Sequence, residues 1–464
     1  MMRRRKAILL AVLLGVLGLG LAFRLAIVDR FHSSSPDGEQ YYLLAQELWR
    51  DGRLAFALPP AQLTHSRLPG YPLFLAFLVD RGPLPQKDHV LRATRANVLL
   101  DLGIAVLVWL LLRDRGWPKA AWVALVACLG CPLLFRLSCY ALSESLATFL
   151  LTLELWLALR AGQRGSLGAV ALAGVAAGAA QLVRLDAVTL LPAVALALWA
   201  TPVRRQRWRL MGTFALVTTL VVLPWPVRNW IQFGAPYIEG TEWPAQDGQP
   251  LPTGAMQWMR TWCTAEPGES YLSVHLVFRL PFSSSTPGLL IPAMYDSEEE
   301  QRRVATLLDR AGRLGLVPEV DREFVALARE RWRRAPLRTL VVLPARRIVR
   351  LWSPPLPGEL PWRIPSLGLT DRHWMFGVWD KTLYVLALLG VLVLVRRGER
   401  HLLAVLASAV AARSLLHSFA VPNFVNQRYL VEVFPLLIAL GAVGLVALVL
   451  IGTRTWRARR VGAS

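Results

Sequence analysis

The sequence predicts an all-α polytopic membrane protein, with about ten transmembrane helices, juxtamembrane helices in the first outer loop and a mixed, mainly helical extramembrane domain. Three observations lead to this class. Hydrophobic residues make up 55% of the 464 residues, and the mean hydropathy of +0.42 is too high for a soluble globular domain. Several apolar runs approach or exceed the roughly 20 residues that cross a bilayer. Basic residues gather in the segments between those runs.

Ten apolar segments are expected to span the membrane, with boundaries accurate to a few residues. The first follows the basic run Arg3 to Lys6, as in a signal peptide, but it lacks a small-residue cleavage site and further spans follow it. We therefore interpret it as an uncleaved anchor. The ten segments are Ala7–Val28, Val90–Leu112, Ala120–Leu137, Leu146–Leu159, Leu167–Val183, Ala187–Ala200, Met211–Leu223, Val378–Val395, Leu402–Phe419 and Leu430–Ile451.

The excess of basic residues predicts the orientation of the chain. The 52 Lys and Arg residues against 31 Asp and Glu give a formal net charge of +21. If the N-terminus is cytoplasmic, the basic clusters all fall on the cytoplasmic side, as the positive-inside rule requires. They lie at residues 113–119, 160–164, 204–209, 396–400 and 454–460. We therefore expect a multi-pass protein of the bacterial plasma membrane, with both termini cytoplasmic and no nucleic-acid partner.

This orientation requires that Pro69–Val79 does not cross the membrane. As a helix, this segment would extend roughly 16 Å, about half the thickness of the hydrocarbon. Counting it as a span would also move the basic clusters between residues 113 and 209 to the outer side. We interpret it as a juxtamembrane or re-entrant element on the outer face, in one cavity with Asp37, Glu39, Arg67 and Tyr71.

The alternation of spans divides the chain into three parts. Residues 1–225 form an N-terminal transmembrane bundle, whose first outer loop, 29–89, is the expected catalytic loop. Residues 226–374 form an outer domain, periplasmic or extracellular, because this stretch between spans is large enough for a domain. Residues 375–464 form the C-terminal transmembrane helices and a basic cytoplasmic tail.

Within the outer domain, helical patterns are predicted at Ser297–Leu314 and Asp321–Arg334. The first opens with acidic residues, which suit a helix N-terminus. Leu337–Trp352 carries arginines among apolar residues and fits either an interfacial amphipathic helix or a packing helix. Cys139 and Cys263 both fall on the outer side, and whether they pair stays open at this point.

Ionisable residues on the expected outer face are the candidates for chemistry. Asp37 and Glu39 follow the first span, and Glu144 opens a later one, where a carboxylate is either functional or suits the helix dipole. Four arginines stand at apolar boundaries against the positive-inside bias. Each can bind a phosphate through two hydrogen bonds, or pair with a carboxylate such as Asp186 or Glu432. The four are Arg67, Arg184, Arg228 and Arg428.

Several common catalytic motifs are absent from the sequence, which has no GxxxxGK[ST], no dinucleotide fingerprint, no HExxH and no DxD run. A nucleotide-driven pump and a metal-dependent nucleotide-sugar enzyme are therefore disfavoured. An outward cavity with carboxylates, arginines and apolar walls suits transfer from a lipid-linked phosphate donor. In that chemistry a carboxylate is the general base on an acceptor hydroxyl, and arginines neutralise the departing phosphate.

Several short motifs occur in an order that resembles the C-type (GT-C) glycosyltransferases, multi-spanning enzymes that use polyprenyl-phosphate sugars. The most similar branch is glycosyltransferase family 39-like and contains the protein mannosyltransferases and the aminoarabinose transferase of lipid A. The order, rather than any single motif, carries the resemblance, which covers most of the chain. The motifs are Asp37-Gly38-Glu39-Gln40-Tyr41, Pro69-Gly70-Tyr71-Pro72-Leu73, Glu144, Pro224-Trp225-x-x-Arg228-Asn229 and Arg428-Tyr429.

The resemblance implies an inverting glycosyltransferase that moves a sugar from a polyprenyl phosphate to a hydroxyl of a lipid, glycan or protein acceptor at the outer face. The family's catalytic base maps to Asp37, by its spacing to Tyr41. Gly38 separates Glu39 from Asp37, so which carboxylate is the base stays open. Glu144 maps to acceptor binding or a second carboxylate. Binding of the donor phosphate is implied for Arg67, Tyr71, Arg184, Arg228 and Arg428.

The cofactor and one alternative function also stay open. Some relatives use a divalent cation and others do not, so the choice is between no metal and an ion such as Mg²⁺, Mn²⁺ or Zn²⁺. A lipid or polysaccharide transporter, or a glycan polymerase or ligase, has a similar topology. A transporter predicts ionisable residues near mid-span, where Asp101, Glu154 and Arg413 are the candidates. The sequence does not specify the sugar, the acceptor or the oligomeric state.

Overall fold

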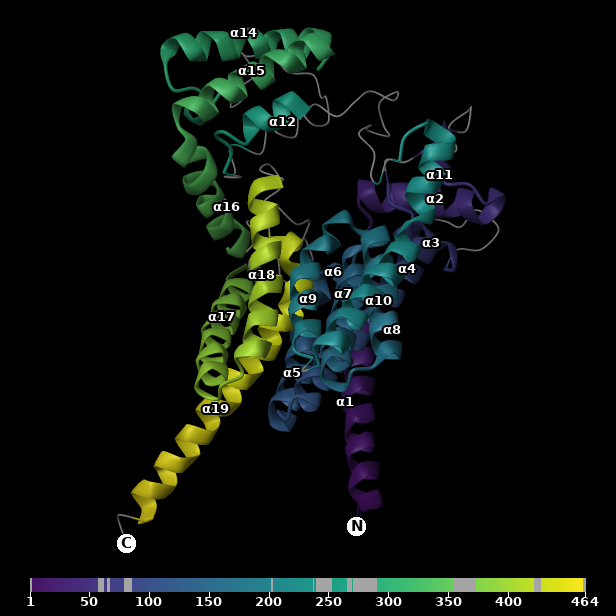
Figure 1. Ribbon diagram of the computed structural model, residues 1–464, viewed down its shortest axis with the longest axis vertical. Coiled ribbons are helices and arrows are strands. Elements are labelled where there is room, and N and C mark those ends of the chain that lie inside the picture. Colours follow the sequence, from purple (N-terminus) through teal and green to yellow (C-terminus); the bar gives the residue numbers. More distant parts are fainter. Residues whose placement is uncertain are drawn as a thin grey trace. The chain divides into compact units, whose positions relative to one another are not determined.

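The chain divides into two compact units (Figure 1). The first comprises Met1–Gly240, Trp362–Val410 and Val431–Ser464, and the second comprises Thr241–Pro361 and Ala411–Leu430. The computed structural model describes residues 2–56, 62–64, 67–78, 86–201, 203–236, 238, 253–264, 269, 290–353, 373–420 and 427–461.

Within the described residues, seven helices are long and apolar enough to cross a membrane. They are α1 (Met2–Phe31), α4 (Gln86–Asp114), α7 (Glu144–Arg164), α10 (Arg204–Val222) continued by α11 (Pro224–Phe233), α17 (His373–Arg396), α18 (Arg400–Ala420), and η6 (Gln427–Val433) continued by α19 (Phe434–Val461). The other apolar elements are the bent pair α5 (Pro118–Gly130) and α6 (Pro132–Ser138), α8 (Leu167–Val183), and η1 (Leu185–Leu190) with α9 (Leu191–Trp199). These elements correspond to the ten predicted segments, and the predicted fold class is confirmed.

The segment predicted as one span at Ala120–Leu137 is bent by 48° between α5 and α6. Pro132 follows the bend, and Cys131 before it is extended, with φ −66° and ψ 117°. A residue before proline is disfavoured in the helical region, and proline supplies no N–H to continue the helix. Cys139, just after α6, and Cys263 are both buried and lie in different units, so whether they pair stays open.

The spans of the first unit approach one another closely at small residues. A Cβ atom at Gly162 in α7 would lie 2.2 Å from the Ala197 carbonyl oxygen of α9. A Cβ atom at Gly178 in α8 would lie 2.6 Å from the Val221 Cβ of α10. Small residues allow such close contact between membrane helices, whose association depends on van der Waals packing.

A buried ion pair joins α1 to α4. Arg24 donates to the carboxylate of Asp101 and, at 3.0 Å each, to the backbone carbonyls of Cys128 and Leu129 in α5. A charge inside a membrane bundle is tolerated when it is paired in this way. Asp101, one of the mid-span residues that a transporter would use, therefore has a structural partner.

The segment between α1 and α4 contains two short helices and a hairpin. α2 (Pro36–Asp51) begins after Ser35, whose hydroxyl accepts a hydrogen bond from the Gly38 N–H, and it ends at Gly52, with φ 65°. β1 (Ala55–Phe56) and β2 (Gln62–Leu63) pair antiparallel, and α3 (Gly70–Ala76) follows. With seven residues α3 is too short to cross a bilayer. This confirms the predicted juxtamembrane element, of which Val79 lies outside the described residues.

The second unit contains a small helical domain with its own core. Its helices are α12 (Thr253–Met259), α14 (Glu298–Leu314), α15 (Pro318–Arg334), η3 (Arg338–Val342) and α16 (Leu343–Trp352), and a short turn, η2 (Pro292–Met294), precedes α14. Trp258, Trp262 and Phe324 are buried at its centre. The predicted helices at 297–314 and 321–334 are present. Ser297 caps α14 by accepting a hydrogen bond from the Glu300 N–H.

The segment predicted as amphipathic, Leu337–Trp352, is helical as η3 and α16. Arg347 is buried and donates to three backbone carbonyls, those of Arg260, Cys263 and Ser418. Val341 and Val349, in contrast, are 57% and 69% exposed. One side of this segment therefore packs within the second unit, and another side presents apolar groups outward.

Candidate active site

The start of α2 is fixed against the segment that leads into α7. Ser33 forms a parallel β-bridge with Tyr140, in which the Ser33 N–H donates to the Cys139 carbonyl at 3.0 Å and the Ala141 N–H donates to Ser33 at 3.3 Å. A Cβ atom at Gly38 would lie 2.7 Å from the Ala141 carbonyl oxygen. Glycine at this position therefore allows the close approach, and it explains why the carboxylates at 37 and 39 are separated by glycine.

Asp37 and Glu39 lie on different faces of α2. Successive residues of a helix are rotated by about 100°, so positions two apart point in nearly opposite directions, whereas positions three and four apart share a face. Asp37 shares its face with Gln40 and Tyr41. Glu39 is exposed on another face. The Asp37 side chain is 43% exposed, so the carboxylate is accessible.

Arg67 binds the Asp37 face of α2. Its Nη2 donates to Asp37 Oδ1 at 2.6 Å and to Gln40 Oε1 at 2.8 Å, and its Nε donates to the same Gln40 oxygen at 3.0 Å. The guanidinium carbon also lies 5.3 Å from the centre of the Tyr41 ring. These three hydrogen bonds, which we call the Arg67 fork, fix the orientation of the Asp37 carboxylate. Gln40 was not singled out from the sequence, although its spacing of three from Asp37 is a usable signal.

Tyr41 and Tyr71 form an aromatic pair beside this fork. Their rings meet edge to face, with centres 5.0 Å apart, and Tyr71 stacks on Phe74 in α3. Burial raises the pKa of Tyr41, and burial together with the charge of Glu144 raises the pKa of Tyr71 well above its usual value. Both phenols are therefore neutral at physiological pH. A Cβ atom at Gly70 would lie 2.7 Å from the Leu182 carbonyl, which shows how closely α3 abuts the end of α8.

Arg184 lies at the end of α8 among three carboxylates. Its guanidinium nitrogens lie 3.2 Å from Glu144, 3.0 Å from Asp186 and 3.3 Å from Glu432. The Glu144 and Glu432 side chains are each 1% exposed. Burial opposes the charge of Arg184, but the three carboxylates outweigh it and raise the pKa of this arginine well above its usual value. Both partners that the sequence offered for this arginine, Asp186 and Glu432, are used, and Glu144 is a third.

The aromatic pair lies between the Arg67 fork and the Arg184 cluster, which consists of Arg184 with Glu144, Asp186 and Glu432. Tyr41 is within electrostatic range of the charges of Arg67, Asp37, Arg184 and Glu144. Tyr71 packs in one buried apolar cluster whose other members come from α2, α4, α7 and α8. Five of the predicted site residues therefore come together in the first unit. They are Asp37, Arg67, Tyr71, Glu144 and Arg184.

Arg228 and Arg428 have different surroundings. Arg228, in α11, donates to the backbone carbonyls of Thr64 at 2.9 Å and Leu54 at 3.3 Å. Its guanidinium also lies over the rings of Trp225 and Phe233. It thus ties the β1–β2 hairpin to α11. Arg428 is half-buried at the start of η6 and belongs to the second unit. A role for either residue at a phosphate stays a prediction.

A metal site is not formed by the residues that the structure describes. Among them, no three His, Cys, Asp or Glu side chains are arranged to hold an ion. The three carboxylates that do converge, Glu144, Asp186 and Glu432, surround a guanidinium. We derive no step of the chemistry through a metal.

Residues 88–230 match the family model described as dolichyl-phosphate-mannose-protein mannosyltransferase. The matched segment contains Glu144, Arg184 and Arg228, and it begins after Asp37 and Arg67. No curated protein sequence matches the chain. The family match confirms the resemblance to the C-type glycosyltransferases that the sequence predicts, and it supports a membrane glycosyltransferase.

Several solved structures are similar to this chain. ArnT from Cupriavidus metallidurans bound to undecaprenyl phosphate is 17% identical, with a TM-score of 0.38 over 95% of this chain and 78% of ArnT. The apo state of the same protein is 16% identical, with a TM-score of 0.37 over 96% and 78%. The apo oligosaccharyltransferase of Archaeoglobus fulgidus is 15% identical, with a TM-score of 0.49 over 97% of this chain and 52% of that protein. This chain therefore matches about half the length of the oligosaccharyltransferase.

Proposed function

We propose that the chain is an inverting glycosyltransferase that moves a sugar from a polyprenyl-phosphate donor to a hydroxyl of a lipid, glycan or protein acceptor at the outer face of the membrane. The observation that carries the proposal is an accessible carboxylate, Asp37, oriented by Arg67 and Gln40 beside the Arg184 cluster. The matched family is named for a polyprenyl-phosphate sugar, dolichyl phosphate mannose, which supports the donor class.

In the proposed reaction Asp37 is the general base. Its carboxylate takes the proton of the acceptor hydroxyl as the hydroxyl oxygen attacks the anomeric carbon. The bond between that carbon and the phosphate oxygen breaks, and the electron pair leaves with the polyprenyl phosphate. Attack from the side opposite the leaving group inverts the anomeric configuration.

We assign different roles to the arginines because their contacts differ. Arg67 lies next to Asp37, where a guanidinium can neutralise charge that develops on the departing phosphate. Arg184 is shared by three carboxylates, so we assign it the positioning of Glu144 in α7. Arg428 remains a further candidate for the phosphate. Glu144 would then face the acceptor as a second carboxylate, and Tyr71 would pack the wall beside it.

The transporter alternative has less support. Asp101 is bound to Arg24 inside the bundle. Arg413, in the second unit, donates to the Tyr429 carbonyl at 2.8 Å. Two of the three mid-span charges therefore have structural contacts that account for their presence. The third, Glu154, is buried, and its Oε1 has no hydrogen-bond partner among the described residues.

The test is a transfer assay with full-length protein reconstituted in vesicles and supplied with polyprenyl-phosphate sugars. Asp37→Asn is expected to lower turnover by roughly 10²–10⁴-fold, the usual worth of a general base, without changing the thermal unfolding midpoint. Glu39→Gln is the matched control, because it removes an exposed carboxylate two residues away on another face, and it should retain turnover within about twofold. Full turnover by Asp37→Asn would remove this residue from the mechanism. Loss in Glu39→Gln alone would transfer the role of base to Glu39.

A further inference from the structure

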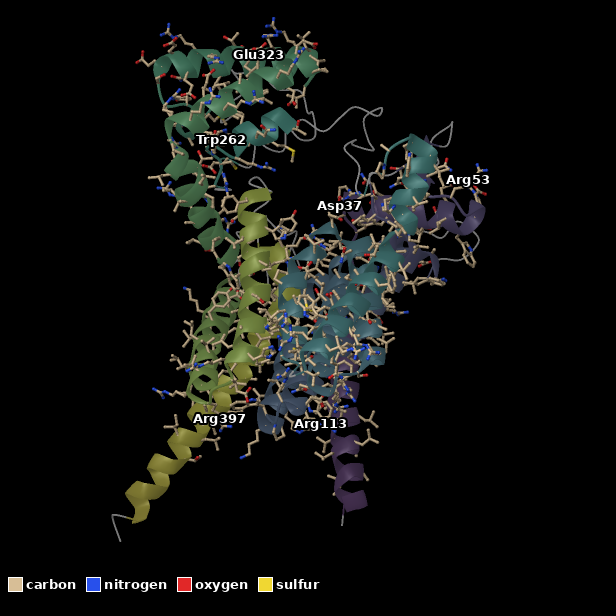
Figure 2. The ribbon with its side chains drawn as sticks, in the orientation of Figure 1. Asp37, Arg53, Arg113, Trp262, Glu323 and Arg397 are labelled. Carbon is tan, nitrogen blue, oxygen red and sulfur yellow. The ribbon has the colours of Figure 1, made fainter. Side chains whose placement is uncertain are left out.

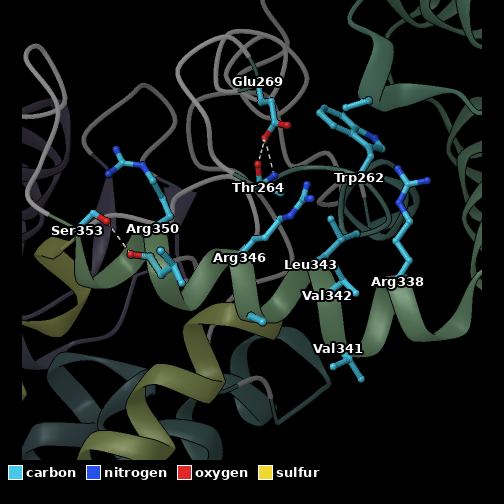
Figure 3. Close-up of a pocket in the computed structure, with 13 residues that line it drawn as sticks. Trp262, Thr264, Glu269, Arg338, Val341, Val342, Leu343, Arg346, Arg350 and Ser353 are labelled. Carbon is cyan, nitrogen blue, oxygen red and sulfur yellow. Dashed lines mark hydrogen bonds between the residues drawn. The ribbon is translucent and has the colours of Figure 1, made fainter.

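The second unit contains a cavity of about 920 Å³ beside η3 and α16 (Figure 3). Its lining combines arginines, apolar side chains and one carboxylate. Figure 3 shows Arg346 extending from α16 toward Thr264 and Trp262. Residues that line it include Trp262, Glu269, Arg338, Val341, Arg346, Val349 and Arg350.

The sequence of α16 explains the mixed character of this wall. Arg346 and Arg350 are four residues apart, as are Arg338 and Val342 before them, and this spacing repeats on one side of a helix. Val341 and Val349, which also line the cavity, leave apolar surface exposed beside the arginines. A cationic stripe next to an apolar one suits a ligand that has an anionic head and a hydrocarbon tail.

Contacts of α16 indicate its level relative to the membrane. Arg347 Nη1 donates to the Ser418 carbonyl at 3.1 Å, and Trp352 Nε1 donates to Ser414 Oγ at 3.1 Å. Both serines belong to α18, whose membrane-competent stretch ends at Phe419. Ser414 is five residues before that end, or roughly 7.5 Å along the helix axis. Arg350 lies between Arg347 and Trp352 in α16, so it is level with the last turns of a span, where lipid phosphates are found.

The polar groups of the cavity favour an anion that accepts hydrogen bonds. Arg346 is exposed and makes no ion pair within the described part of the chain, whereas Arg338 is paired with Asp296 at 2.7 Å. Glu269 is engaged by Thr264, whose N–H and hydroxyl both donate to it. The indole N–H of Trp262 is buried and finds no acceptor among the described residues. Phosphate oxygens would supply acceptors both for Arg346 and for this N–H.

We propose that this cavity binds the phosphate headgroup of an anionic phospholipid from the surrounding bilayer, with Arg346 on the phosphate and an acyl chain along Val341 and Val349. The site lies in the second unit and uses no residue of the proposed transfer chemistry. The Asp37→Asn protein is therefore expected to bind the lipid like the unchanged protein, which separates this proposal from the proposed function.

The test is native mass spectrometry of the full chain in detergent micelles, titrated with dioctanoyl phosphatidylglycerol, with dioctanoyl phosphatidylcholine and, separately, with inorganic phosphate. Each arginine at an anionic lipid surface contributes a factor of roughly five in affinity. Arg346→Gln should therefore weaken phosphatidylglycerol binding about fivefold. Arg322→Gln in α15, which removes an arginine whose side chain is 75% exposed, is the matched control and should change nothing.

Three outcomes would overturn the proposal. Equal affinity for the anionic and the zwitterionic lipid would show that the arginines do not select a charge. Unchanged phosphatidylglycerol binding by Arg346→Gln would exclude this cavity as the lipid site. Because Arg346 is exposed, that variant is expected to keep the unfolding temperature of the unchanged protein. Inorganic phosphate that binds as tightly as the lipid, or Val349→Asp that leaves lipid binding unchanged, would identify a site for free phosphate instead.

Discussion

Arg67 connects the residues on which the proposed chemistry depends. One guanidinium reaches Asp37 and Gln40 at the same time and lies over the Tyr41 ring. A planar fork with several N–H groups can make these contacts together, whereas a lysine ammonium is a single point charge. The identity of the cation at position 67, and not only its charge, should therefore matter for the orientation of the base.

We predict that Arg67→Ala lowers kcat roughly a hundredfold, as expected when one charged donor to a developing anion is lost. Arg67→Lys should recover only part of this loss, because it restores the charge without the fork. Steady-state transfer kinetics of the two variants, with protein of matched unfolding temperature, make the comparison. Equal rates for Arg67→Lys and the unchanged protein would show that charge alone is sufficient, and an unaffected Arg67→Ala would exclude Arg67 from the site.

The charged residues of the candidate site were predictable from the sequence more often than the side chains with which they pair. The outer carboxylates and arginines stand out because they interrupt apolar surroundings, and Asp37, Arg67, Glu144 and Arg184 do meet. That one arginine is shared by Glu144, Asp186 and Glu432 could not be derived, since these residues come from elements far apart in the chain. The different surroundings of Arg228 likewise depend on where the β1–β2 hairpin folds back.

Close approaches between elements set the position of the site. α2 approaches the segment before α7 at Gly38, and α3 approaches the end of α8 at Gly70. In both places a Cβ atom would lie 2.7 Å from a backbone carbonyl oxygen, which cannot move aside as a side chain can. These two glycines therefore allow the segment between α1 and α4 to lie against the bundle.

We predict that Gly38→Ala and Gly70→Ala each destabilise the protein by about 1–3 kcal/mol through overpacking, and lower transfer activity because α2 or α3 is displaced. Gly212→Ala in α10 is the control, since nothing lies within 4 Å of its Cβ position. That change should be neutral or stabilise by about 0.5–1 kcal/mol, because alanine favours a helix. Thermal unfolding together with the transfer assay measures both effects. Retained activity in Gly38→Ala would show that the contact at Ala141 is not required.

The contact between the start of α14 and the end of α15 should respond to acid. Burial alone would raise the pKa of Asp296 and Glu300. Hydrogen bonds and charges from Arg338, Arg331 and Arg334 lower the pKa of Asp296, and the Asp296 N–H, Arg334 and Arg331 lower that of Glu300. Carboxyls with a lowered pKa in the folded state stabilise the fold above their unfolded pKa, and this stabilisation is lost as the pH falls through the folded pKa. The loss should therefore begin at about pH 5, just above the unfolded pKa values, and grow as the pH falls.

We predict that amide hydrogen exchange in α14 and α15 accelerates between about pH 5 and pH 3, after correction for the intrinsic pH dependence of exchange. In Glu300→Gln this acid response should be smaller, and protection at neutral pH should already be reduced. Glu319→Gln is the control, because Glu319 is 63% exposed in its pair with Arg322. The same acid response in Glu300→Gln and the unchanged protein would contradict the assigned ion pairs.

The long spans were predictable as elements because each apolar run is long enough by itself to identify a membrane helix. The bend at Pro132 was not predicted, although proline restricts the residue before it. The partner of Asp101 was not predicted either, because Arg24 lies in a helix far away in the sequence. Local patterns thus predicted the helices, whereas their pairing depends on tertiary packing.

At the scale of the whole molecule, the distribution of charge in the first unit supports one orientation. Figure 2 shows Asp37 and Arg53 at one end of this unit and Arg113 and Arg397 at the opposite end. The two latter arginines belong to the basic clusters that the positive-inside rule assigns to the cytoplasm. The candidate active site therefore lies at the end that the rule assigns to the outer face.

We predict that Arg53→Cys in intact cells reacts with a membrane-impermeant maleimide, and that Arg113→Cys reacts only after the membrane is permeabilised. The four native cysteines are buried, so background labelling should be low. Arg397→Cys is a second cytoplasmic probe and should behave like Arg113→Cys, because both lie at the same end of the first unit. The reverse pattern would place Asp37 in the cytoplasm, where the acceptor would also have to be found. Labelling of both Arg53→Cys and Arg113→Cys from outside would place both residues on the same side of the membrane. In that case either α4 does not cross the membrane or α3 crosses it as well.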